Sequence, residues 1–63
     1  MSERLKELRV KNKLSQTKLA AELGISQFTV TSMETGRQIP SVEIIAKYAA
    51  FFKVTTDWII GAE

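Results

Sequence analysis

Amide and hydroxyl side chains gather on one side of a short segment, residues 27–35. If this segment is a helix, each residue advances by about 100°, and Val30 and Met33 lie on the opposite side. The outward residues are Gln27, Phe28, Thr31 and Ser32. The Gln27 amide donates and accepts at once, so it can pair with N6 and N7 of adenine, while the Phe28 ring suits a thymine methyl group. This side is a candidate for reading base edges; a solvated glutamine and an aromatic ring packed on a neighbouring helix are the alternatives.

The residue types that usually carry out catalysis or bind metals are scarce. The 63 residues include no histidine and no cysteine, and the seven carboxylates show no spacing that would pair them for acid and base chemistry. We therefore expect neither an enzyme nor a metal or cofactor site. The longest apolar run, residues 48–52, is too short for a membrane span or a signal peptide. Together with the lack of cysteine, this predicts a cytoplasmic protein without a membrane partner.

Residues 16–35 have the pattern of a helix-turn-helix. Leu19 and Leu23 give the first helix an apolar side, Ala20 allows close approach of the second helix, and Ile25 closes the apolar contact behind the turn. The link between the helices needs the positive φ that Gly24 tolerates. The second helix then projects from the body, as a helix must in order to enter the major groove of DNA.

The rest of the chain predicts three more helices and a single all-α domain over residues 1–63. Ser2, Ser15, Ser26, Ser41 and Thr55 or Thr56 are candidate caps, which place helices over residues 2–12, 16–23, 27–35, 41–52 and 56–61. The predicted core consists of Leu5, Leu8, Leu14, Leu19, Ala20, Leu23, Ile25, Val30, Met33, Val42, Ile45, Ala49, Phe52, Val54, Ile59 and Ile60.

A series of short motifs resembles the Cro/C1 (XRE-type) helix-turn-helix family of phage and bacterial transcription regulators. The motifs are RLKELR from residue 4, LSQ from 14, LA from 19, LGIS from 23, ETGR from 34, PS from 40 and DWIIG from 57. The resemblance implies a compact five-helix fold of the lambda-repressor type. It also implies sequence-specific binding to double-stranded DNA in the cytoplasm, at the nucleoid. The expected function is that of a repressor, a homodimer on a palindromic operator.

The resemblance also places phosphate-binding residues around the recognition helix. It sets Gln16 against the DNA backbone and beside Gln27, and the amide groups at this helix start favour an anion. The full set of expected phosphate contacts is Gln16, Thr17, Lys18, Thr29, Thr35, Arg37, Ser41 and Arg9. Arg9 and Glu34 match a family ion pair that joins the first helix to the end of the third, and we expect its role to be mainly structural.

Three residues depart from the family pattern. Lys53 stands where many relatives have glycine, so it either takes a positive φ or the fourth helix ends differently. Phe51 and Trp58 replace residues that are commonly small or polar. As a surface aromatic pair they would form a dimer interface, and additional core packing is the alternative.

A second class of function stays open, that of a protein-interaction module on the same fold, as in antitoxins and coactivators. A patch dominated by Phe28, Ile39, Phe51 and Trp58 would favour it. Charge does not decide between the two, because the net charge is only +2, with +3 in residues 1–13, 0 in 14–40 and −1 in 41–63.

Overall fold

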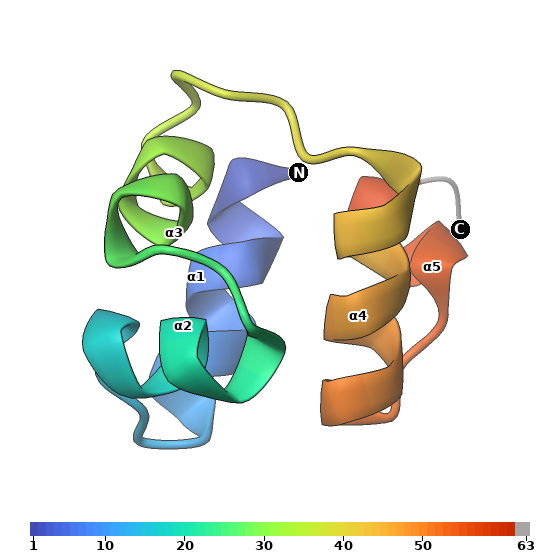
Figure 1. The fold of residues 1–63 in the computed structure, drawn as a ribbon. Helices are drawn as coiled ribbons and strands as arrows, with labels where there is room; N and C mark the ends of the chain where they lie inside the picture. Colours follow the sequence, from blue (N-terminus) through green and yellow to red (C-terminus); the bar gives the residue numbers. More distant parts are fainter. Residues whose placement is uncertain (62–63) are drawn as a thin grey trace.

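Five helices follow one another in the computed structural model, which describes residues 1–61. They are α1 (Ser2–Lys11), α2 (Gln16–Leu23), α3 (Gln27–Glu34), α4 (Val42–Phe52) and α5 (Thr56–Ile60) (Figure 1). The described residues contain no strand, which confirms the predicted all-α fold. The last two residues of the predicted 1–63 domain lie outside the described part.

Hydroxyl side chains cap four of the helices as the sequence predicts. Ser15, Ser26, Ser41 and Thr55 each accept a hydrogen bond from the backbone N–H three residues later, at 3.0, 3.0, 3.2 and 3.0 Å. The predicted cap at Ser2 is wrong, because α1 already begins at Ser2 and Met1 provides no side-chain cap.

The helix-turn-helix is formed by α2, α3 and the turn at Gly24. Gly24 has a φ of +70°, and the amides of Gly24 and Ile25 return hydrogen bonds to the end of α2, at Ala21 O and Ala20 O. α3 packs against α2 and α1, while α4 packs against α5 and α2. Figure 1 shows the segment between α3 and α4 crossing from one side of the molecule to the other.

The core lies where the five helices meet. Its buried residues are Leu5, Leu8, Leu19, Ala20, Leu23, Val30, Met33, Tyr48 and Ile59. The predicted core is wrong at Val42, which is 84% exposed, and at Ile60, which is 47% exposed. Tyr48 was missed although it is completely buried. The buried side of α4 centres on Tyr48, and a helical advance of about 100° per residue turns Val42 away from it.

The end of α4 shows how the chain tolerates Lys53 at the position of a glycine. Lys53 has a φ of +57° and ends the helix in the left-handed region, the first of the two outcomes predicted. A side chain in this region costs conformational energy that glycine avoids.

We predict that Lys53→Gly raises the free energy of unfolding by about 0.5–1 kcal/mol, because it removes this strain. Lys53→Ala is the matched control, since it removes the same charge and keeps a Cβ atom. Chemical denaturation measures both variants. A glycine variant no more stable than the alanine variant would show that the positive φ carries no cost here.

Candidate nucleic-acid interface

The first turn of α3 carries the most exposed part of the predicted reading surface. Gln27 is exposed and the Phe28 side chain projects into solvent, with 75% of its surface accessible. Thr31, one turn later, is partly buried. The structure therefore brings three of the four predicted base-reading residues to one side of α3, with exposure falling along the helix.

Ser32 does not belong to this surface, and its predicted outward position is wrong. Only 6% of the residue is accessible. The chain after α3 folds back over this turn, where the backbone N–H groups of Arg37 and Gln38 donate to the carbonyl oxygen of Ser32 at 2.9 and 3.2 Å. The second half of α3 is therefore covered, and a helical projection centred on Val30 could not show this.

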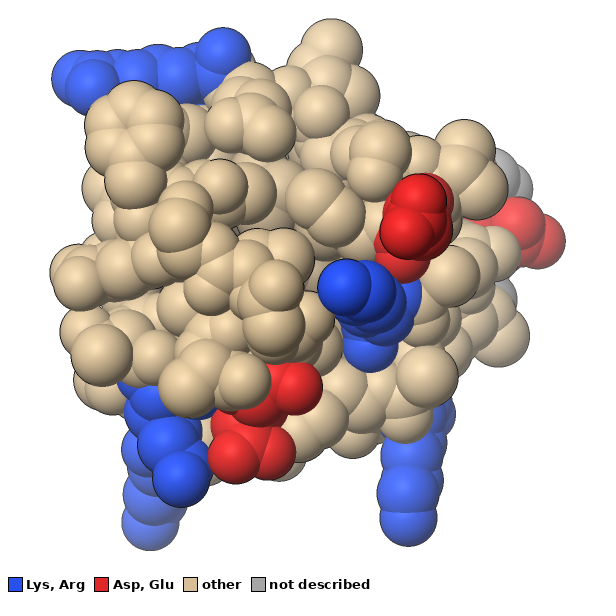
Figure 2. Space-filling view, viewed as in Figure 1, with Lys and Arg blue, Asp and Glu red and all other residues tan. Residues whose placement is uncertain are grey.

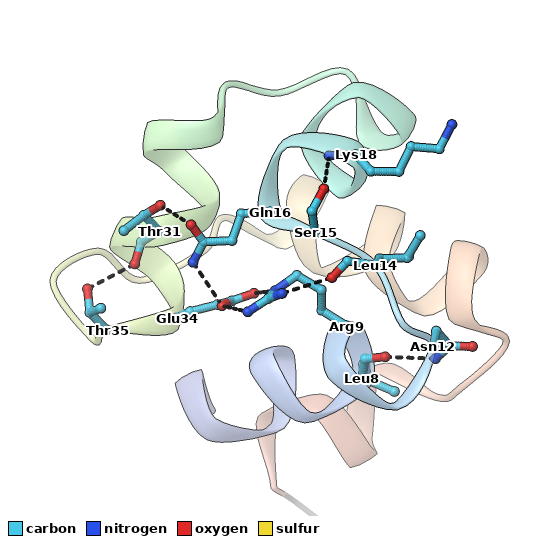
Figure 3. A network of polar contacts seen from close by, with 10 residues as sticks. All are labelled: Leu8, Arg9, Asn12, Leu14, Ser15, Gln16, Lys18, Thr31, Glu34 and Thr35. Atoms are coloured by element: carbon cyan, nitrogen blue, oxygen red, sulfur yellow. Dashed lines mark hydrogen bonds and ion pairs between the residues drawn. The ribbon is translucent and has the colours of Figure 1, made fainter.

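The C-terminal half of α3 is anchored by a polar network that joins three helices (Figure 3). Arg9 of α1 binds both carboxylate oxygens of Glu34, with Nε to Oε2 at 2.7 Å and Nη2 to Oε1 at 3.0 Å. Gln16 of α2 donates to Glu34 Oε1 at 3.3 Å and accepts from Thr31 Oγ1 at 2.8 Å. The predicted contact between Arg9 and Glu34 is therefore present, and Gln16 extends it to the second helix.

Arg9 faces inward, and its expected phosphate contact stays a prediction. Its third donor, Nη1, binds the carbonyl oxygen of Leu14 at 2.8 Å, and only 14% of its side chain is accessible, against 2% for Glu34. The hydrogen bonds to Glu34 raise the pKa of the Arg9 guanidinium, while burial acts in the opposite direction. The guanidinium fork thus binds the Glu34 carboxylate and the Leu14 carbonyl oxygen, and so links α1, Leu14 and α3.

Tyr48 of α4 lies close enough to Arg9 and Glu34 for their charges to affect the pKa of its phenol. Burial raises the pKa of the Tyr48 phenol to about 12; the Glu34 carboxylate adds to this rise and Arg9 opposes it. The phenol oxygen has no hydrogen-bond partner among the described residues. Tyr48 is thus neutral at any physiological pH, and its ring contributes to the core by packing.

The partner of Gln27 is Thr17, which corrects the prediction that Gln16 would brace it. Thr17 Oγ1 donates to Gln27 Oε1 at 3.1 Å, whereas the Gln16 amide is turned inward to Glu34 and Thr31. Gln16 thus contacts the C-terminal half of α3, and its neighbour Thr17 contacts the first residue of α3. Sequence spacing placed Gln16 and Gln27 at the starts of adjacent helices but could not show which of the first α2 side chains points to Gln27.

The other expected phosphate contacts are spread along the edges of α2, α3 and the following segment. Lys18 is exposed and pairs with Glu22 at 3.6 Å, and Thr29 Oγ1 lies 2.8 Å from the Ser26 hydroxyl. Thr35 Oγ1 donates to the carbonyl oxygen of Thr31 at 2.9 Å. Ser41 caps α4, and Arg37 is exposed without a side-chain partner among residues 1–61. On the face drawn in Figure 2, basic side chains stand apart and form no continuous patch.

Phe51 and Trp58 have different surroundings and do not act as the surface pair expected from the sequence. Phe51 is 38% exposed, packs edge-on against Phe52 with ring centroids 5.0 Å apart, and borders a groove between α2 and α4. Trp58 packs on the core, and the Arg4 guanidinium lies 4.8 Å from its ring centroid and donates to its carbonyl oxygen. For Trp58, the alternative of additional core packing is the better description.

No helix in residues 1–61 is long and apolar enough to cross a membrane. Within the same residues, no three side chains of the metal-binding types lie together.

We predict that Arg9 and Glu34 are strongly coupled in stability. Arg9→Met or Glu34→Met alone leaves a buried charge unpaired, which costs about 3–5 kcal/mol of unfolding free energy. The double variant should lose at most about 1 kcal/mol, so the coupling between the two positions should be about 5 kcal/mol or more. Chemical denaturation measures this cycle, and the exposed pair Lys18 and Glu22 provides the control, with at most about 0.5 kcal/mol. Additive losses at Arg9 and Glu34 would contradict the role of the pair.

Comparison with known proteins agrees with this geometry. Residues 5–59 match the helix-turn-helix family. The chain is 39% identical over 54 residues to the uncharacterized HTH-type transcriptional regulator MJ0272 of Methanocaldococcus jannaschii, covering 86% of this chain and 82% of the relative. It is 39% identical over 61 residues to the HTH-type transcriptional regulator AnsR of Bacillus subtilis, covering 97% of this chain and 53% of AnsR.

A third relative is the HTH-type transcriptional activator BcrR of Enterococcus faecalis, 32% identical over 62 residues, covering 98% of this chain but only 30% of BcrR. The chain thus spans less than two thirds of AnsR and BcrR and most of MJ0272. All three relatives are named as transcription regulators and none as an enzyme. Because the match includes all of α2 and α3 and nearly the whole chain, this protein belongs to the Cro/C1-type helix-turn-helix family of transcription regulators.

Proposed function

We propose that this protein binds double-stranded DNA sequence-specifically by inserting the N-terminal half of α3 into the major groove. The observation that carries the proposal is the division of α3 into an exposed first turn and an anchored second half. Gln27 and Phe28 project from the surface, while Glu34 is held by Arg9 and Gln16. A short helix whose second half is anchored and whose first turn is exposed can be placed against base edges without reorganising.

The exposed residues have complementary roles in this proposal. Gln27 reads a base edge through hydrogen bonds, and Phe28 contacts a thymine methyl group, which accounts for an aromatic ring left 75% accessible. Thr31 is partly buried and bonded to Gln16, so it reaches the groove only at its margin.

Phosphate contacts position the helix. We assign them to the backbone N–H groups at the starts of α2 and α4, at Gln16 and Ser41, and to Lys18, Thr29, Thr35 and Arg37 at the edges of the motif. Lys18 and Arg37 are the only basic side chains among these residues, and Lys18 is already paired with Glu22. Binding should therefore fall with salt less steeply than in proteins that rely on a basic patch.

The assembly on DNA is proposed to be a homodimer on a palindromic operator. α3 has eight residues and reads only a few base pairs, so one subunit has little specificity and two half-sites are needed. Phe51 is the residue we place in the subunit contact, because it is a partly exposed aromatic residue at the edge of the groove between α2 and α4. The contact is small, and we expect a monomer in solution that dimerises on DNA.

We further propose that the protein is a cytoplasmic repressor that occludes a promoter. The relative BcrR is named an activator, so the direction of regulation has to be measured. A reporter gene under the selected operator should be less active when the protein is present, and increased activity would reverse this assignment. A protein-interaction module is less well supported, because Trp58, one of the four aromatic or apolar residues of its expected patch, packs on the core.

Selection of binding sites from a random pool of duplex DNA tests the reading role of Gln27. We expect an enriched palindrome, and Gln27→Ala should reduce binding to it by about 1–3 kcal/mol while leaving non-specific DNA nearly unaffected. Gln38→Ala is the control, because this exposed glutamine lies outside α3. Equal losses on specific and non-specific DNA would remove Gln27 from the reading surface, and a pool without enrichment would favour the protein-interaction alternative.

Titration of half-site and full-site DNA tests the subunit contact. Phe51→Glu should weaken cooperative occupancy of the full site about tenfold or more through charge repulsion and lost apolar contact, with half-site affinity unchanged. Thermal unfolding verifies that the variant is folded. Lys53→Gln, two residues along and exposed, lowers the net charge by the same single unit and is the control. Equal losses on both DNAs, or no cooperativity in the parent protein, would place the contact elsewhere.

A further inference from the structure

The hydrogen bond between Thr17 and Gln27 lies at the outer edge of the helix-turn-helix. Thr17 is the second residue of α2 and Gln27 the first residue of α3, and both side chains are exposed. The bond spans 3.1 Å and runs from Thr17 Oγ1 to Gln27 Oε1. It is the contact that fixes the side chain proposed to read DNA, and it comes from a residue expected only to bind phosphate.

A threonine hydroxyl has one proton, and here that proton is donated to Gln27. While this bond exists, the Thr17 side chain cannot also donate to a phosphate oxygen. The amide oxygen of Gln27 is turned toward α2, so the amide nitrogen with its two N–H groups is directed away from α2. The Gln27 nitrogen donates to no described residue, and both of its protons are available to a ligand.

This orientation changes which base the glutamine matches. The bidentate pairing of glutamine with adenine needs the amide oxygen and nitrogen side by side against N6 and N7. The Thr17 hydroxyl uses one of the two lone pairs of the amide oxygen and keeps this oxygen directed to α2, so the part of the amide that faces outward is the NH2 group, which only donates. Guanine offers two adjacent acceptors in the major groove, N7 and O6, and no donor there.

We propose that Thr17 is a positioning residue that sets base preference by holding the Gln27 amide with its N–H groups outward, so that Gln27 reads guanine rather than adenine. The inference rests on the proposed insertion of α3 into the major groove. It differs from the adenine pairing expected from the sequence.

Site selection from random duplex DNA, followed by sequencing, tests this with four proteins: the parent, Thr17→Val, Thr17→Ser and Gln27→Ala. Thr17→Val keeps the shape and removes the hydroxyl, and Thr17→Ser keeps the hydroxyl. Gln27→Ala identifies the base position that Gln27 reads. Circular dichroism and thermal unfolding verify that the exposed substitutions leave the fold unchanged.

At the position identified by Gln27→Ala, the parent should prefer guanine over adenine by about fivefold or more. Thr17→Val should lower this ratio to about one or invert it in favour of adenine, whereas Thr17→Ser should keep the ratio of the parent. An adenine preference in the parent, or an unchanged ratio in Thr17→Val, would overturn the role of Thr17. If Gln27→Ala alters no position, the proposed reading by Gln27 fails instead, and the two failures are thereby distinguished.

Discussion

The buried ion pair between Arg9 and Glu34 is the interaction on which the arrangement of the first three helices depends. A charged pair out of water must be matched in geometry, and here Arg9 makes three short hydrogen bonds, two to the carboxylate and one to the Leu14 carbonyl oxygen. The pair therefore fixes the orientation of α3 relative to α1. Because Gln16 binds the same carboxylate, the orientation of α2 relative to α1 and α3 is fixed as well.

This constraint matters because α3 has little other means of holding its direction. A helix of eight residues is marginal in isolation, and its fully buried apolar side chains are only Val30 and Met33. Apolar packing is non-directional, so two such contacts permit rotation of the helix about its axis. The hydrogen bonds of Glu34 at the C-terminal end of α3 prevent this rotation. Gln27 and Phe28 in the first turn can therefore stay exposed without packing on the core.

Much of the fold could be predicted from local chemistry. The caps at Ser15, Ser26, Ser41 and Thr55 and the turn at Gly24 depend on a few consecutive residues, and all were predicted. The contact between Arg9 and Glu34 could not be derived from spacing alone and was predicted from the family resemblance.

The predictions fail where the burial or the partner of a residue depends on the three-dimensional path of the chain. Ser32 is covered by the chain that follows α3, and a projection of a single helix contains no such chain. The choice between Gln16 and Thr17 as partner of Gln27 depends on how two helices are rotated about their axes. Trp58 was expected at the surface, yet Arg4, distant in sequence, lies over its ring.

We expect the ion pair to orient the recognition helix and to contribute little net stability compared with an apolar replacement. The affinity of the double variant Arg9→Met and Glu34→Met for the selected operator tests this most directly, measured beside its free energy of unfolding. An apolar pair of similar volume should leave stability within about 1 kcal/mol of the parent or raise it. Operator affinity should fall about tenfold or more, because the helix is no longer held in one orientation. A double variant that is as stable as the parent and binds the operator equally well would show that the ion pair does not orient α3.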